Sequence, residues 1–267
     1  IINMHTQKWK TYLSELAKAE DIDLSSFEIQ DDLHPKFWDE QKKLNPRIRK
    51  RLLNIAREFM DELGIESDQI LDITMTGSLA NYNWSKFSDI DLHIIVNYED
   101  IDDNSELVKD YVTAKRIVWN DTHDIKIYGF EVEVYVEDES EDHMSTGIYS
   151  IQYDEWKTEP VHKAESFCEH CVQTKAVALM HQIDDIEQKF ELEDYDMVLS
   201  RSLALKAKIK KLRQTGLEKT GAYSVENLAF KVLRRSGYLG KLSDLKNASY
   251  DELMSMENGG GRIRIKI

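Results

Sequence analysis

Two acidic residues one position apart, Asp89 and Asp91, open an apolar segment that runs to Val96. Side chains alternate between the two faces of a strand, so both carboxylates point one way while Ile90 and Leu92 point into the core. Two like charges on one face repel each other unless a cation lies between them. The usual cation is a divalent metal ion bound by oxygen ligands. The pair therefore predicts a metal site.

A glycine and a serine, Gly77 and Ser78, follow an apolar run from Ile70 to Met75 that predicts a short buried strand. Glycine lets the backbone approach a ligand closely. A serine at a strand-to-helix turn can cap the helix and leave free N–H groups beside the acids. This arrangement suits a nucleoside triphosphate, with the acids holding Mg²⁺ and Gly77 and Ser78 holding the phosphate tail.

A third acid is offered by the segment from Phe130 to Val136, which alternates strictly and predicts a strand. Its valines share one face, and Glu131 and Glu133 share the other.

The order of these parts, Gly-Ser, ten residues and then Asp-x-Asp, resembles the nucleotidyltransferase superfamily to which DNA polymerase β belongs. The resemblance implies a third carboxylate on a neighbouring strand, assigned here to Glu133, with Glu131 left open as the alternative. It implies two Mg²⁺ or Mn²⁺ ions bound by Asp89, Asp91 and Glu133. The implied reaction transfers a nucleoside monophosphate from an NTP, expected to be ATP, to an acceptor hydroxyl and releases pyrophosphate.

The acceptor stays open at this stage, between an RNA or tRNA end, a protein, a small molecule and a second nucleotide. An alternative class is a non-catalytic nucleotide-binding or virion-associated protein that retains the fold. The complete set of three acids argues against this alternative. The segment from Glu226 to Arg235 resembles uncharacterised nucleotidyltransferases of tailed bacteriophages. That resemblance implies the cytoplasm of a bacterial host as the location.

Charge is unevenly distributed along the 267 residues. A net charge of −15 argues against a protein that coats nucleic acid non-specifically. From Arg201 to Lys241, however, eleven basic residues face only two acidic ones, which predicts a focused site for anions. Within this region Lys231, Arg234 and Arg235 are expected to bind nucleotide phosphate and neutralise the charge that develops on the leaving group. No run of 18 apolar residues exists, so no membrane partner is expected.

The two cysteines, Cys168 and Cys171, allow two interpretations. A Cys-x-x-Cys pair can form half of a zinc site, with His162 or His181 completing it. No second pair is present, and the segment is predicted to be helical, so two reduced thiols in a cytosolic helix are favoured.

The overall order implied by the resemblance is an α+β chain, a small mixed β-sheet with flanking helices followed by an all-helical C-terminal domain. A helix is predicted from Pro46, capped by Asn45 and ended by Gly64. Its outer face is expected to be solvated, although one of its basic residues could reach a phosphate; they are Arg47, Arg49, Lys50 and Arg51. Gly216 and Gly221 are predicted to bracket a turn. The expected domains are an N-terminal amphipathic helix and acidic linker (1–33), the nucleotidyltransferase domain (34–160), a helical domain (161–256) and a Gly-rich basic tail (257–267).

Overall fold

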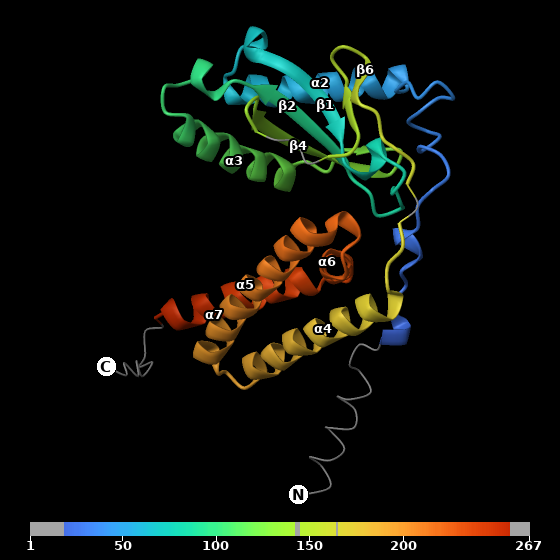
Figure 1. Cartoon of the computed structure of the whole chain (residues 1–267). Coiled ribbons are helices and arrows are strands. Elements are labelled where there is room, and N and C mark those ends of the chain that lie inside the picture. The colour runs from blue at the N-terminus through green and yellow to red at the C-terminus, as the bar shows by residue number, and fades with distance from the viewer. Residues whose placement is uncertain (1–18, 142–144, 164, 257–267) are drawn as a thin grey trace, which may run out of the picture. The chain divides into compact units, whose positions relative to one another are not determined.

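The computed structural model describes residues 19–141, 145–163 and 165–256, which form two compact units (Figure 1). The sheet unit comprises residues 25–163, and the helical unit combines 19–24 with 165–256. The predicted N-terminal helix lies outside the described residues except for its end, where Ala19–Asp21 forms a short 3₁₀ helix. The predicted basic tail, residues 257–267, also lies outside them.

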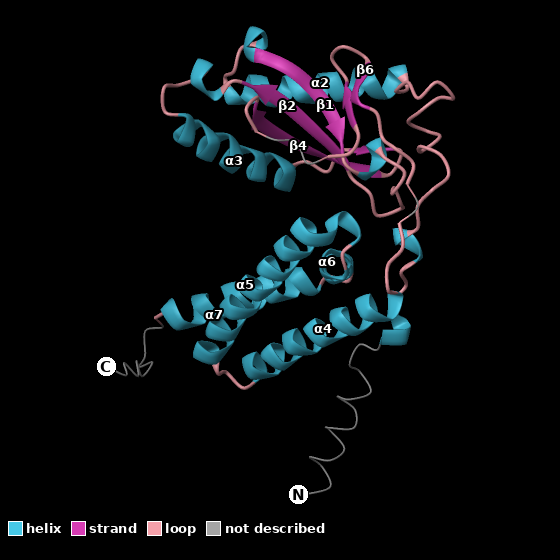
Figure 2. Cartoon of the chain, viewed as in Figure 1, coloured by secondary structure: helices cyan, strands magenta, loops and turns pink. Residues whose placement is uncertain are grey.

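The sheet unit is built on one mixed sheet of six strands in the order β3-β4-β2-β1-β5-β6 (Figure 2). Strands β2 and β4 are parallel, and the other neighbouring pairs are antiparallel. The predicted α+β class is therefore confirmed. The strand bounds are β1 (Ile70–Thr76), β2 (Ile90–Val96), β3 (Lys126–Ile127), β4 (Phe130–Asp138), β5 (Ile148–Ser150) and β6 (Glu155–Thr158).

Alternation along β2 and β4 separates an apolar face from a polar one. Ile90 lies opposite Val132, and Asp91 lies opposite Glu133 on the other face. The apolar side chains join one hydrophobic core with helices α2 (Pro46–Leu63) and α3 (Ser105–Thr122). Because the core needs the apolar residues inside, the side of the sheet on which the acids lie is specified.

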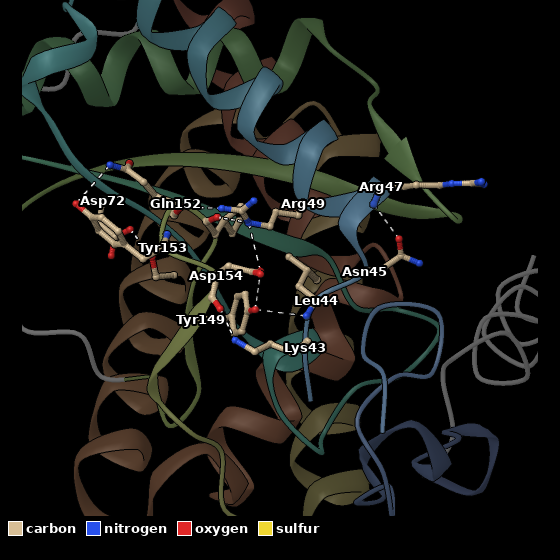
Figure 3. Close-up of polar contacts among 12 residues, drawn as sticks. Lys43, Leu44, Asn45, Arg47, Arg49, Asp72, Tyr149, Gln152, Tyr153 and Asp154 are labelled. Atoms are coloured by element: carbon tan, nitrogen blue, oxygen red, sulfur yellow. Dashed lines mark hydrogen bonds and ion pairs between the residues drawn. The ribbon is translucent and has the colours of Figure 1, made fainter. Parts of the chain in front are cut away.

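Helix α2 begins and ends as predicted. The Asn45 side chain accepts a hydrogen bond from the Arg47 amide, Pro46 is the first helical residue, and Gly64 ends the helix in the left-handed conformation. Its outer face is not wholly solvated, because Arg49 donates to the carbonyls of Ile151 and Gln152, each at 2.7 Å. Figure 3 shows this arginine directed at the turn between β5 and β6, which it ties to α2.

The helical unit consists of α4 (Glu169–Glu191), α5 (Tyr195–Thr220), α6 (Val225–Arg235) and α7 (Tyr238–Met254), preceded by the 3₁₀ helix at Ala19–Asp21. Buried aliphatic residues from all four helices form its interior, among them Val172, Ile183, Val198, Leu228 and Leu242. Among the described residues, none of the helices combines the length and apolar character needed to cross a bilayer.

The predicted turn at Gly216 is wrong, because α5 runs through this residue to Thr220. Gly216 is buried inside the helix, and a Cβ atom there would lie 2.7 Å from Ser224 Oγ and 2.8 Å from Glu226 Cβ. The glycine thus serves the close approach of α6 to α5 rather than a turn.

The expectation of two reduced thiols is also wrong, since Cys168 and Cys171 form a disulfide with their Cα atoms 5.2 Å apart. Cys168 is not inside the helix but precedes α4 as its N-cap, with an extended backbone. That geometry brings the two cysteines within bridging distance. The zinc alternative finds no support among the described residues, where no cluster of possible metal ligands includes a cysteine.

Candidate active site

Three carboxylates converge at one end of the β2–β4 pair. Asp89 precedes β2, Asp91 lies within it, and Glu133 lies on β4 directly beside Asp91. One ligand atom from each lies within 4.8 Å of the others, and all three residues are half-buried. The strand register therefore brings together residues that are far apart in the sequence.

Glu131 does not join this cluster. Its side chain is 60% exposed, and its carboxylate lies 3.7 Å from Lys126 Nζ on the neighbouring edge strand β3. Glu131 and Glu133 share a face, but two residues of strand separate them by about 6.6 Å. This distance leaves Glu133 as the acid beside Asp91.

The cluster is suited to a divalent cation. Carboxylate oxygens are hard ligands, which favour Mg²⁺ or Mn²⁺ over the softer metals that thiolates select. Three negative charges held this close repel one another, and a bound cation relieves that repulsion. The donor set therefore fits the metal ions that the sequence predicts at Asp89, Asp91 and Glu133.

Gly77 forms a wall of the same site. Its backbone has φ +76°, a conformation that favours glycine, and a Cβ atom there would lie 1.8 Å from Asp91 Oδ2. The absence of a side chain at Gly77 therefore leaves the space that the Asp91 carboxylate occupies.

Ser78 lies next to this wall and does not cap a helix as expected, while its role as a ligand of the nucleotide remains a prediction. The turn that follows is a three-residue 3₁₀ helix, Ser78–Ala80, with Gly77 at its N-cap and no side-chain cap. The Ser78 hydroxyl is instead 2.7 Å from the hydroxyl of Ser88, the residue before Asp89. This contact joins the two ends of the loop between β1 and β2 and links the Gly-Ser turn to the residue before Asp89.

A tyrosine that the sequence interpretation missed supports the third acid. Tyr135 lies two residues after Glu133 on the same face, and its hydroxyl donates a hydrogen bond to Glu133 Oε2. Burial raises the pKa of the Tyr135 phenol, and the bond to Glu133 raises that pKa further. The hydroxyl therefore stays protonated as a donor. The period-two alternation of this strand could have indicated its position.

Two more side chains pack on the ring of Tyr135. The guanidinium of Arg116, from α3, lies 4.8 Å from the ring centroid. The ring of His93 stacks on Tyr135 at 4.8 Å, and His93 Nδ1 lies 2.8 Å from Glu137 Oε1. His93 thus contacts two side chains of the neighbouring strand β4.

The three predicted cations of the C-terminal part lie on α6, in the helical unit. Arg234 lies close enough to Arg213 to lower the pKa of that guanidinium, although burial of Arg213 is the larger cause. As ligands of a nucleotide, Lys231, Arg234 and Arg235 remain a prediction.

Comparison with known proteins bears on the sheet unit. The model of the nucleotidyltransferase domain family matches residues 53–155, a stretch that begins within α2, ends at the start of β6 and includes all three clustered acids. This stretch of the chain is therefore similar to nucleotidyltransferase domains. No curated protein matches the chain.

One solved structure resembles the chain, that of the STING-associated CdnE c-di-GMP synthase from Capnocytophaga granulosa. The two are 13% identical in sequence over 79% of this chain and 84% of that chain, with a TM-score of 0.20.

Proposed function

We propose that the nucleotidyltransferase domain transfers a nucleoside monophosphate from an NTP, with ATP as the expected donor, to an acceptor hydroxyl. The observation that supports this most is the convergence of Asp89, Asp91 and Glu133 within 4.8 Å, inside the stretch that matches the family. Gly77, which leaves room for Asp91, belongs to the same stretch.

Each acid has its own role in the proposal. Asp89 and Asp91 would together hold two Mg²⁺ or Mn²⁺ ions, and Glu133 would be a further ligand. When bound, such ions supply positive charge that neutralises the phosphates and orients the reacting oxygens. The backbone at Gly77 and the hydroxyl of Ser78 hold the β- and γ-phosphates, and Lys231, Arg234 and Arg235 neutralise charge on the leaving group.

In the reaction, a bond forms between the acceptor oxygen and the α-phosphorus, and the bond from that phosphorus to the β-bridging oxygen breaks. Pyrophosphate leaves with the electron pair, and the hydroxyl proton passes to Glu133 as general base. The hydrogen bond from the Tyr135 hydroxyl to Oε2 holds the Glu133 carboxylate in one orientation.

Two forms of labelled ATP, one carrying the label on the α-phosphate and one on the γ-phosphate, test this proposal. Each is incubated with Mg²⁺ and, in turn, with RNA, protein and small-molecule fractions. Label from the α-position should enter one fraction, label from the γ-position should leave in pyrophosphate, and Asp91→Asn should abolish both.

Entry of the γ-label into the acceptor would indicate phosphoryl transfer and contradict the proposal. Binding of ATP and Mg²⁺ with no transfer to any fraction would favour the non-catalytic nucleotide-binding alternative.

A further inference from the structure

A basic groove runs along one side of α5 in the helical unit. Its main hollow, of about 540 Å³, lies against the C-terminal half of α5 and the first turn of α6. A second hollow of about 280 Å³ lies between α4 and the N-terminal half of α5. Lys208 lines both, so they adjoin. Polar groups of the main hollow include Lys208, Lys211, Thr215, Lys219, Thr220 and Glu226.

The cations of this basic groove form one row. At 100° per residue, Arg201, Lys208, Lys211 and Lys219 fall within about 80° of one another around the helix axis. At 1.5 Å rise per residue, the row from Arg201 to Lys219 is about 27 Å long. The two hollows thus expose a line of positive charge rather than a single point.

Little within the helical unit neutralises this row. Lys208 donates to Gln182 Oε1, a neutral acceptor, at 2.9 Å. In the part of the chain that the structure describes, no carboxylate forms an ion pair with Arg201 or Lys211. The row is therefore available to an anionic ligand, in a chain whose net charge of −15 repels such ligands elsewhere.

Two acids line the basic groove, Asp185 in the second hollow and Glu226 in the main hollow. Glu226 forms an ion pair with Lys175 of α4. The hydrogen bond from Lys175 lowers the pKa of the Glu226 carboxyl, and Lys219 lowers it further through its charge. Gly216 lets this first turn of α6 lie directly against α5, which closes one side of the main hollow.

We propose that the basic groove binds a single strand of nucleic acid through its phosphodiester backbone. This inference rests on the proposed function for its biological role, in which the strand supplies the acceptor hydroxyl. A single row of cations about 27 Å long matches one backbone with regularly repeated charge, and single-strand sites typically cover about 4–16 nucleotides. The groove is too long for the phosphates of one nucleotide.

The lining of the groove specifies how the strand is recognised. Lysine, arginine and threonine donate to phosphate oxygens, whereas stacking on bases requires aromatic rings, and neither hollow has an aromatic residue in its lining. Binding should therefore depend on the number of phosphates and on salt, with little dependence on base sequence. A lipid surface would call for exposed apolar residues beside the cations, and Leu212 is the principal apolar residue of the main hollow.

Binding is measured with the full-length protein and a fluorescent twelve-nucleotide RNA, in EDTA so that no transfer occurs. The double variant Lys211→Glu/Lys219→Glu should lower the affinity more than tenfold. It should also reduce the slope of log affinity against log salt by about 1.4, since each phosphate contact to a single strand contributes about 0.7. Lys210→Glu is the matched control, because Lys210 is exposed on the opposite side of the same helix and lines neither hollow.

A gain of affinity provides a test that misfolding cannot imitate. Glu226→Gln removes the one acid of the main hollow and releases Lys175 from its ion pair. We expect RNA to bind about threefold to tenfold more tightly to this variant. A matched DNA oligonucleotide distinguishes recognition of the shared backbone from recognition of the 2′-hydroxyl.

Equal affinity of the parent and the double variant for RNA would overturn the inference. So would binding of phosphatidylserine vesicles in place of RNA, or full displacement of the RNA by an equal concentration of ATP. Transfer to a non-nucleic-acid acceptor without RNA binding would contradict the inference about the basic groove and support the proposed function. RNA binding without any transfer would support the inference about the basic groove and contradict the proposed function.

Discussion

A Cβ atom on residue 77 would lie 1.8 Å from the Oδ2 atom of Asp91, so the Asp91 carboxylate occupies the space where a side chain of residue 77 would begin. We predict that Gly77→Ala displaces Asp91 and abolishes nucleotide transfer. The variant should also melt at a lower temperature, because its φ of +76° strains any residue with a Cβ. Transfer assays and thermal melting measure the two effects.

Gly221→Ala is the control for backbone strain alone. Gly221 has nearly the same backbone angles as Gly77, φ +77° and ψ −159° against φ +76° and ψ −161°, but its added Cβ would meet nothing within 4 Å. It should lose about 1–3 kcal/mol of unfolding free energy and keep its activity. Equal activity in the two variants would show that the contact with Asp91 does not matter for the reaction.

Glu133 and Glu131 form a matched pair for the third acid. Glu133→Gln keeps the volume but removes the charge beside Asp91, and we expect turnover to fall by about two orders of magnitude or more. Glu131→Gln only loses a solvent-exposed contact with Lys126 and should be nearly neutral. Steady-state kinetics with ATP decides between them, and the opposite order would move the site to Glu131.

Tyr135 is predicted to position Glu133 rather than to react. Tyr135→Phe removes the hydrogen bond to Glu133 Oε2, and since such bonds to charged groups contribute about 1.5–3 kcal/mol, turnover should fall at least about tenfold. The KM for ATP should change little. Tyr128→Phe, at an exposed position, is the control, and an unchanged kcat for Tyr135→Phe would refute the positioning role.

Metal and nucleotide should stabilise the fold together. In EDTA, Asp89→Asn should melt at a temperature no lower than the parent, since removing one of three clustered negative charges relieves repulsion. Mg²⁺ with ATP should raise the melting temperature of the parent only, and the free energy of unfolding should increase by up to about 2.7 kcal/mol at a hundredfold excess over Kd. A large destabilisation of Asp89→Asn with retained activity would make Asp89 a structural residue.

The stability of the sheet unit should depend on pH through His34. Burial lowers the pKa of this histidine below its usual 6.5, helped by the nearby charge of Lys36. The unfolded chain therefore binds more protons just below pH 6.5, so stability is complete above that pH and decreases as the pH falls. Thermal melting between pH 7.5 and 5 should show this decrease in the parent.

His34→Gln should reduce that dependence on pH, whereas His170→Gln, at an exposed position, should leave it unchanged. The His34 ring is buried against two aromatic rings, with centroid distances of 4.4 Å to Trp84 and 5.1 Å to Phe130, and this burial disfavours its protonated form. An identical pH dependence in the parent and in His34→Gln would exclude this histidine as the source.

The acid cluster could be predicted because its parts follow local rules. Period-two alternation indicated β2 and β4, and the apolar face that must be buried determined which side the acids share. The partner of each acid could not be predicted in the same way. That Glu133 rather than Glu131 lies beside Asp91 depends on the parallel register of two strands, which no local pattern specifies.

The features that the sequence did not indicate depend on contacts between distant residues. Strand β6 has no alternating pattern. Its Trp156 stacks on Trp38 at 4.6 Å and donates to the carbonyl of Lys42. The Ser78 hydroxyl forms a hydrogen bond with the Ser88 hydroxyl, at the other end of the same loop, instead of capping a helix. In each case tertiary packing outweighs the local propensity on which the prediction relied.

The parallel pairing of β2 with β4 has a consequence for biosynthesis. Strand β1 and strand β2 are antiparallel neighbours, whereas β4 reaches β2 only after the chain has returned through α3. A growing chain thus exposes Asp89 and Asp91 before Glu133 has been made. The cluster of three carboxylates can form only when the crossover is complete and β4 pairs with β2.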